Sequence, residues 1–236
     1  MRKNLDTSDE KRNFAGENII IHKNQKETTT MKVLLINGSP RKDGNTQTAL
    51  NECAKQLKAN GIDTVDAWVG TKPVRGCIAC GKCREMGGGR CVFDDDVTNG
   101  IIDLMEQCDA LIIGAPVYWG QPAAQAMALQ QRMLYAGGAA FKGKPAAVIT
   151  VCRRGGASAA FQTLQMPFQM CNMPIVTSQY WNIAYGRTPG EAALDTEGMQ
   201  TMRTLANNMA VMLKMYATGQ AETPAPEDWM PMHFIR

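Results

Sequence analysis

The chain has 236 residues, 44% of them hydrophobic, and a formal net charge of +3. This length and apolar content suit one α/β domain with additions, and a mild charge with scattered Lys and Arg argues against a nucleic-acid partner. No apolar run approaches the roughly 20 residues that cross a bilayer, and the N-terminus lacks the apolar core of a secretory signal. We therefore predict a soluble, cytoplasmic protein with no membrane partner, whose eight cysteines are thiols or metal ligands rather than disulfides.

Residues 1–30 differ in composition from the rest of the chain and are predicted to form a disordered N-terminal extension. They mix charges of both signs, and their one apolar cluster, three isoleucines, is too short for a core element. The main domain is expected over residues 31–220, and a tail over residues 221–236 contains three prolines that break regular structure. His22 and His233 fall in these two extensions and are poor candidates for a general base.

Apolar runs alternate with amphipathic helical segments through the main domain, a pattern typical of a doubly wound parallel sheet between two layers of helices. The expected strands cover residues 32–36, 65–69, 110–113, 146–151 and 174–178. Polar neighbours alternate with the apolar residues of the second strand, which indicates an edge position. Apolar residues at spacings of three and four mark the last helix, and four of the five are methionines: Met199, Met202, Leu205, Met209 and Met212. They predict a buried apolar face rather than a copper site.

The segment NGSPRKDGNT, residues 37–46, follows the first expected strand and has the composition of a phosphate-binding turn. Gly38 and Gly44 permit a tight turn, and the positive end of the following helix lies there. Side-chain donors and positive charge come from Ser39, Arg41, Asn45 and Thr46. The segment matches neither GxxxxGK[ST] nor GxGxxG, so we predict a cup for a single phosphate. The alternative is an ordinary polar turn.

Four cysteines lie close together between the second expected strand and a helix expected from about Asp96. Three follow the spacing CxxCxxC and the fourth comes after a glycine-rich turn: Cys77, Cys80, Cys83 and Cys91. This spacing can surround a 4Fe-4S cluster, whereas structural zinc sites usually pair two separated CxxC motifs. A loop without metal that covers a neighbouring site is the other possibility. Cys53 and Cys108 lie on apolar helix faces and are expected in the core.

The motif GAPVYWGQP follows the third expected strand, and CRRGGA follows the fourth. The small residue Gly114 keeps the strand exit narrow enough for a planar ring, and Tyr118 and Trp119 add flat apolar surface. Arg153 and Arg154 stand beside two glycines and suit the rim of an anion site. The alternatives are interfacial aromatic residues and solvated surface charges. Ligands of doubly wound sheets bind where the first and third strands end.

These segments, together with SQYWNIAYG, occur in an order that resembles the flavodoxin-like NAD(P)H-dependent FMN reductase family, which includes iron–sulfur flavoproteins. The resemblance covers roughly residues 31–218. It implies a three-layer α/β/α, flavodoxin-like fold with a five-stranded parallel sheet in the order 2-1-3-4-5, and bound FMN. It also implies NAD(P)H as co-substrate and a homodimer or homotetramer.

The resemblance further implies which residues hold FMN. The expected phosphate contacts are Ser39, Arg41, Asn45, Thr46 and Gln47. The expected ring contacts are Pro116, Val117, Tyr118, Trp119 and Gly120, with Arg153, Gly155 and Gly156 from the next loop. The same resemblance assigns a 4Fe-4S cluster to the four neighbouring cysteines. No catalytic side chain is nominated, because FMN itself accepts the hydride.

The sequence therefore predicts an FMN-dependent oxidoreductase that takes a hydride from NAD(P)H and passes electrons to a second acceptor. One alternative is an iron–sulfur flavoprotein that relays electrons between FMN, a 4Fe-4S cluster and protein partners. A less favoured alternative is a thiol-based redox sensor. The choice of NADH or NADPH and the identity of the acceptor stay open.

Overall fold

The computed structural model describes residues 30–219. The predicted arm, apart from Thr30, and the predicted tail lie outside these described residues, as do His22 and His233. Within the described range, no helix combines the length and the apolar character that a membrane crossing needs.

Five parallel strands form the sheet. They are β1 (Lys32–Asn37), β2 (Asp63–Trp68), β3 (Ala110–Tyr118), β5 (Ala146–Cys152) and β6 (Ile183–Tyr185). Their spatial order is β2-β1-β3-β5-β6, which confirms the predicted order of the parallel strands. The register places Val33 opposite both Thr64 and Ala110, and Leu111 opposite Ala146. A short sixth strand, β4 (Gln121–Pro122), pairs antiparallel with the end of β3 and was not predicted.

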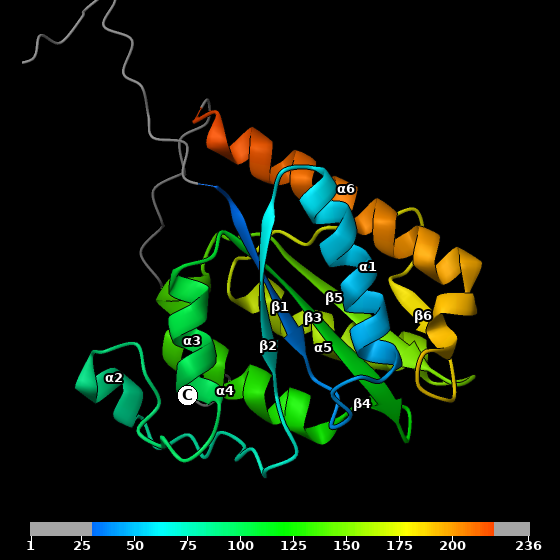
Figure 1. Cartoon of the computed structure of the whole chain (residues 1–236). Helices are drawn as coiled ribbons and strands as arrows, with labels where there is room; N and C mark the ends of the chain where they lie inside the picture. The colour runs from blue at the N-terminus through cyan, green and yellow to red at the C-terminus, as the bar shows by residue number, and fades with distance from the viewer. Residues whose placement is uncertain (1–29, 220–236) are drawn as a thin grey trace, which may run out of the picture.

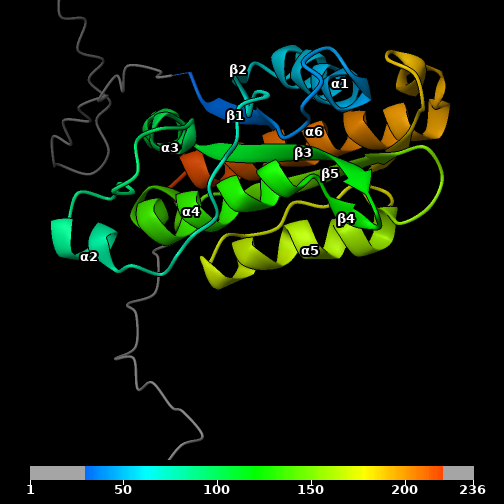
Figure 2. The same ribbon diagram turned by 90° about the horizontal axis from the view of Figure 1, so that it is seen from below.

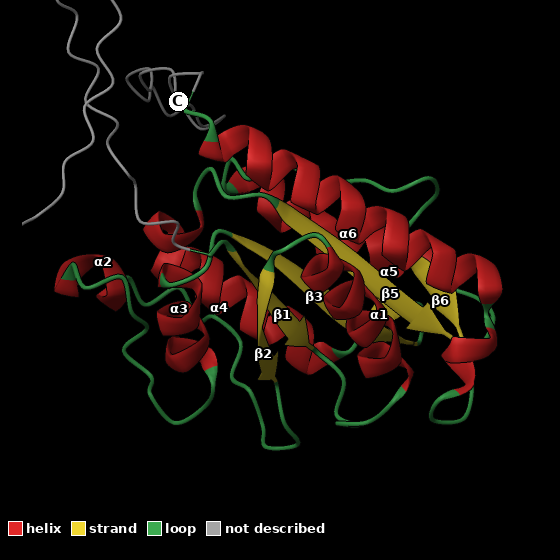
Figure 3. Ribbon diagram, turned by 45° about the horizontal axis from the view of Figure 1, so that its top comes forward, coloured by secondary structure: helices red, strands yellow, loops and turns green. Residues whose placement is uncertain are grey.

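Helices cover both faces of the sheet, so the molecule has the three predicted layers (Figures 1 and 2). One face carries α1 (Asn45–Ala59) and α6 (Thr196–Ala217), which lie side by side in Figure 3. The other carries α3 (Thr98–Glu106), α4 (Ala124–Phe141) and α5 (Ala157–Met170). A separate apolar core fills each side of the sheet. The interior strands are largely apolar because both of their faces are buried.

The methionine-rich helix α6 packs as predicted. Met199, Met202 and Met209 are buried in the core that α6 shares with α1 and the sheet. Asp195 begins the helix, and its Oδ1 accepts a hydrogen bond of 2.9 Å from the Gly198 N–H. The side-chain acceptor satisfies an amide that has no partner within the first turn.

The prediction for the third strand was too short. It was expected to end at residue 113, but β3 continues to Tyr118, so Pro116, Val117 and Tyr118 are strand residues rather than loop residues. Parallel pairing with β5 extends to Pro116 opposite Val151, and Val117 then pairs antiparallel with Pro122.

The prediction for the fifth strand, residues 174–178, was wrong in position. Only one bridge forms there, between Ile175 and Ala146. The chain then leaves the sheet, and the Ser178 Oγ donates to the carbonyl oxygen of Tyr180 at 2.6 Å and contacts the Asn182 side chain at 2.7 Å. The chain returns to the sheet as β6, so a local side-chain turn separates the bridge at Ile175 from the strand that completes the sheet.

Two short helices complete the structure. The helix α2 (Lys82–Met86) lies among the cysteines, outside the three layers in Figure 1, and η1 (Glu191–Leu194) precedes α6. The helix expected from about Asp96 begins at Thr98, whose N–H donates to the Asp96 carboxylate at 3.0 Å.

Candidate functional site

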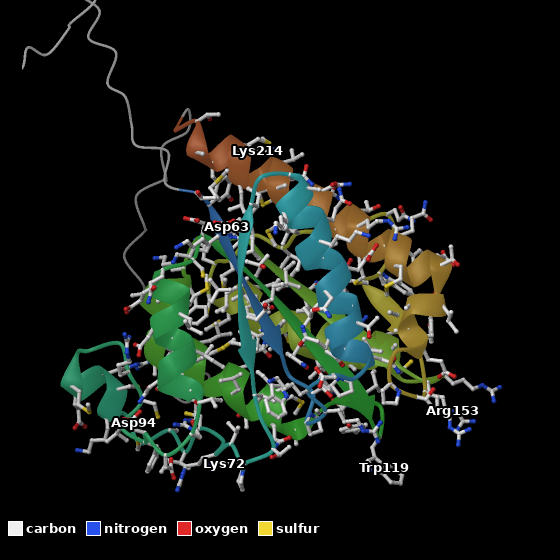
Figure 4. The ribbon with its side chains drawn as sticks, in the orientation of Figure 1. Asp63, Lys72, Asp94, Trp119, Arg153 and Lys214 are labelled. Carbon is white, nitrogen blue, oxygen red and sulfur yellow. The ribbon has the colours of Figure 1, made fainter. Side chains whose placement is uncertain are left out.

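The carboxyl ends of the parallel strands meet at one end of the molecule. Lys72, Trp119 and Arg153 follow β2, β3 and β5, and Figure 4 shows all three at that end, opposite Asp63 and Lys214. Doubly wound sheets bind ligands at this edge. The candidate site is therefore formed by the loops that leave β1, β3 and β5.

The loop after β1 lies directly against β3. The Gly38 N–H donates a hydrogen bond of 2.8 Å to the carbonyl oxygen of Gly114. A Cβ on Gly38 would lie 2.7 Å from the Cβ of Ala126 on α4 and 2.9 Å from the same Gly114 oxygen. The predicted phosphate loop and the strand that leads to the predicted ring contacts thus touch at a position where only glycine fits.

Asn37, the last residue of β1, is buried and holds the phosphate loop from inside. Its Nδ2 donates to the Lys42 carbonyl oxygen at 3.0 Å and to the Gln47 Oε1 at 2.9 Å, and its Oδ1 accepts a bond of 2.9 Å from the Ser39 N–H. Trp68, at the end of β2, donates from Nε1 to the Ser39 carbonyl oxygen at 2.8 Å. Neither residue was predicted; the local signal for Asn37 is a polar residue that ends an apolar strand.

The first turn of α1 fits an anion. Its N-cap is Gly44, which has no side chain, and no other side chain of the described residues caps this turn. The N–H groups at the positive end of a 15-residue helix are therefore open to a ligand oxygen. Ser39 and Thr46 are both buried in this loop. The Ser39 Oγ accepts a bond of 3.1 Å from the Arg41 N–H, which leaves its O–H to donate.

Two of the predicted phosphate contacts have side chains that are held by the protein. The Asn45 Oδ1 accepts a hydrogen bond of 3.0 Å from the Ala192 N–H in η1. Gln47 accepts from Asn37 and donates from Nε2 to the Asn51 Oδ1 at 2.8 Å. These two side chains tie the loop to its surroundings. Gln47 uses both ends of its amide in doing so, whereas the Asn45 Nδ2 forms no hydrogen bond with the described residues and can still donate to a phosphate, as can the backbone of the turn, Ser39, Thr46 and the exposed Arg41.

The chain reverses direction between β3 and β4 at residues that were predicted to contact a ring. Trp119 and Gly120 have positive φ angles of 52° and 75°, as in a two-residue hairpin turn. The side chains of Tyr118 and Trp119 are exposed, that of Trp119 fully. A Cβ on Gly156 would lie 2.8 Å from the Gly120 Cα, so the loop after β5 packs against this hairpin.

The loop after β5 gives the site a positively charged rim. Arg153, Arg154 and Gly155 are all exposed, and Figure 4 shows Arg153 pointing away from the body of the protein. Neither arginine forms a salt bridge with any residue of the range 30–219. Unpaired guanidinium groups at a site entrance favour an anionic ligand.

All four predicted metal ligands line one hollow. It lies between the cysteine segment, defined as residues 75–96, and the side chains of Arg132 and Tyr135 on α4. The four ligands are Cys77, Cys80, Cys83 and Cys91. The first two are exposed and the last two half-buried. Four thiols around one hollow match the donor set of an iron–sulfur cluster, although the described side chains are not drawn together around a single point.

A buried ion pair adjoins this hollow. The side chains of Arg132 and Asp96 are 1% and 3% exposed and contact each other closely. Burial alone would raise the pKa of Asp96, but hydrogen bonds from Thr98 and Arg132 lower it below the usual value. Burial would likewise lower the pKa of Arg132, and hydrogen bonds to Cys91 and Asp96 raise it instead. Arg132 was not predicted, and its place on an amphipathic helix gives no local signal for this role.

The other cysteines behave as core residues or isolated thiols. All eight cysteines of the chain lie within the described residues and are free thiols. Cys53 and Cys108 are buried as predicted, and burial raises the pKa of both thiols. A thiol with a raised pKa carries little thiolate, so neither residue is expected to react or to bind metal.

Known proteins share both the sequence pattern and the fold. The NADPH-dependent FMN reductase family matches residues 31–188. The chain is 32% identical over 193 residues to an iron–sulfur flavoprotein of Methanocaldococcus jannaschii, which covers 78% of this chain and 98% of the relative. It is also 32% identical over 191 residues to an iron–sulfur flavoprotein of Methanosarcina thermophila, and this match covers 78% of the chain and 96% of that relative. A flavodoxin, a WrbA-like protein from Agrobacterium tumefaciens, superposes with a TM-score of 0.55 at 14% identity over 79% of this chain and 99% of that one, which shows a flavodoxin-like fold.

Proposed function

The chain belongs to the NADPH-dependent FMN reductase family, and from this premise we propose that it binds FMN across the ends of β1, β3 and β5. In this proposal it takes a hydride from NAD(P)H and passes electrons to a second acceptor. The supporting observation is the contact between Gly38 and Gly114, which joins a phosphate-type loop to the strand that carries the ring contacts.

The phosphate end of the proposed site depends on the uncapped first turn of α1. Its open N–H groups, the Ser39 hydroxyl and the Arg41 guanidinium are suited to the two negative charges of a phosphate monoester. Asn37 and Trp68 hold this loop in place before the ligand arrives. A pre-formed loop reduces the entropy that binding must overcome.

The ring end depends on backbone rather than on titratable side chains. When bound, FMN supplies the redox chemistry by accepting a hydride at N5. The hairpin from Val117 to Gly120 presents backbone and flat apolar side chains, and Gly156 holds the hairpin in position. The exposed Arg153 and Arg154 stand where the phosphates of NAD(P)H would approach from solvent.

An anaerobic visible spectrum tests this function. Protein made with excess riboflavin should carry about one FMN per chain, and NAD(P)H should bleach it. Ser39→Ala should raise the Kd for FMN about tenfold or more, since it removes a hydrogen bond to a charged group, whereas Ser158→Ala, an exposed serine on α5, should leave the Kd unchanged. Protein that binds no FMN at micromolar concentration would refute the proposal.

A second form of this function, an electron relay, is favoured by the cysteine hollow. The four thiols that line it fit a 4Fe-4S cluster, and Cys91 already accepts a hydrogen bond there. Anaerobic analysis should find about four iron and four sulfide per chain. Cys91→Ser should lower this content, and Cys171→Ser, at a half-buried cysteine outside the hollow, should not. Absence of both elements from wild-type protein would remove the relay and leave the flavin function in place.

We also propose a cytoplasmic homodimer or homotetramer. A fully exposed Trp119 beside the ring site is the reason, because a second subunit would shield both from water. Light scattering of the flavin-loaded protein would measure the mass, and a monomer at micromolar concentration would contradict this part.

A further inference from the structure

Arg132 buries a positive charge in a place where the fold does not require one. It lies on α4, among residues that pack between the sheet and the cysteine segment, and its side chain is 1% exposed. An unpaired guanidinium would be strongly unfavourable there. Its presence therefore depends on the partners that surround it.

Those partners all belong to the cysteine segment. Besides the Asp96 carboxylate, Arg132 donates from Nη1 to the Arg75 carbonyl oxygen at 3.3 Å and from Nη2 to the Phe93 carbonyl oxygen at 2.8 Å. Its Nε donates to the Sγ of Cys91 at 3.3 Å. The contacts fall at both ends of the segment, before the first cysteine and after the last, so one side chain closes the segment against α4.

The contact to Cys91 is chemically distinct from the others. Among the four cysteines that line the hollow, Cys91 is the one whose sulfur accepts a hydrogen bond from another described residue. Hydrogen bonds to the sulfurs of iron–sulfur clusters make them easier to reduce, and groups that contact metal ligands fix their orientation. A donor on a rigid helix, aimed at the last of four ligands, is suited to both tasks.

We propose that Arg132 is a positioning residue for the cysteine segment: it closes the segment onto α4 and donates an N–H hydrogen bond to Cys91, the fourth ligand. This inference rests on the relay form of the proposed function. Lysine at this position would keep a charge near Asp96 but would lose the planar fork and the Nε donor. If Arg132 only had to supply a positive charge, lysine could replace it. If Arg132 positions the segment and donates to Cys91, lysine cannot replace it.

The experiment compares wild type, Arg132→Lys and Arg90→Lys after anaerobic reconstitution with ferrous iron and sulfide. Arg90 is the matched control, because it lies in the same segment but its side chain pairs with Asp103 and Glu106 and forms no hydrogen bond with a cysteine. In competition with a chelator, Arg132→Lys should retain 10- to 100-fold less cluster than wild type. Alternatively, its cluster should have a reduction potential lower by about 59 mV, which is a tenfold shift of the reduced-to-oxidised ratio toward the oxidised form. Arg90→Lys should match wild type. Equal cluster retention and equal potential in Arg132→Lys would overturn the proposal.

A second measurement needs no cluster. Trypsin cleavage after Lys82 and Arg84, both exposed in the segment, should be several-fold faster in Arg132→Lys than in wild type. If wild type takes up no iron and sulfide, the relay fails and this cleavage rate decides the inference alone, with equal rates overturning it. If Arg132→Lys does not fold, Asp96→Asn takes its place, with a smaller change in the same direction expected and no change overturning the inference.

Discussion

The indole N–H of Trp68 donates a hydrogen bond of 2.8 Å to the carbonyl oxygen of Ser39, so that the edge strand supports the loop that leaves the central strand. Trp68→Phe removes this bond and keeps most of the ring. We expect the binding free energy of FMN to weaken by about 1 kcal/mol. This corresponds to about a fivefold rise in the Kd. Quenching of flavin fluorescence measures the Kd, and Trp181→Phe, at an exposed tryptophan, is the control. Equal affinity of the two variants for FMN would contradict the supporting role of Trp68.

Asn37 is the buried centre of the phosphate loop. Asn37→Ala leaves the Ser39 N–H and the Lys42 carbonyl oxygen without their partner. We expect the free energy of unfolding to fall by about 2 kcal/mol, since unsatisfied buried polar groups are unfavourable. Urea denaturation checks this, and Asn51→Ala, at an exposed position on α1, should cost less than about 0.5 kcal/mol. Similar losses for the two variants would show that the loop does not depend on Asn37.

Gly38 has no room for a side chain. In Gly38→Ala the new Cβ would meet the backbone oxygen of Gly114 and the Cβ of Ala126 at less than 3.0 Å. We expect destabilisation by about 1–3 kcal/mol from overpacking, together with loss of FMN binding. Gly100→Ala, on α3 with nothing within 4 Å, should instead stabilise by about 0.5–1 kcal/mol. Thermal unfolding and flavin titration of both variants distinguish local crowding from a general effect of alanine.

Gly156 and Gly190 have the same φ of +86° but different surroundings. A Cβ on Gly156 would lie 2.8 Å from the Gly120 Cα, whereas nothing lies within 4 Å of one on Gly190. Alanine at either position should cost about 1 kcal/mol for the backbone conformation. Only Gly156→Ala should also displace the ring hairpin and weaken FMN binding. Equal flavin affinities in the two variants would contradict the contact between these loops.

The ion pair of Asp96 and Arg132 predicts a dependence of stability on pH. The pKa of Asp96 is lowered in the folded protein, so the unfolded chain takes up its proton first, near pH 4. The stabilisation by the charged carboxylate is therefore complete above about pH 5 and decreases as the pH falls through the unfolded and then the folded pKa. Urea denaturation should give a difference between wild type and Asp96→Asn that is constant from pH 5 to 8 and shrinks below pH 4. A stability difference that grows as the pH falls would contradict this prediction, because it would mean that the pKa of Asp96 is raised by folding.

The layers and the order of the parallel strands follow from the sequence because their signals are local. Val33–Ile36 and Leu111–Ile113 are continuous apolar runs, as buried parallel strands require, and the methionines of α6 repeat at the helical period. The hairpin at Trp119 and the detour between Ile175 and Ile183 do not follow. Both depend on which residues meet across the sheet.

In the candidate site too, local features could be predicted from the sequence and long-range contacts could not. The phosphate loop and the cysteine spacing are continuous in the sequence and were found there. Trp68 lies 29 residues from Ser39, and Arg132 lies 36 residues from Asp96, so the chain has to fold before these pairs exist. Gln47 has the right chemistry for a phosphate, but its hydrogen bonds to Asn37 and Asn51 are visible only in the structure.

The helix α4 begins beside the ring hairpin, where the Ala123 N–H bonds to the Pro116 carbonyl oxygen at 3.0 Å, and carries Arg132 two turns later. The eight residue steps from Ala124 to Arg132 span about 12 Å along the helix axis. The non-helical backbone at Gly137 falls beyond this stretch. The helix therefore fixes the separation between the ring hairpin and Arg132, whatever the length of the loops elsewhere. In the proposed relay, this helix would set the distance that an electron crosses within one subunit.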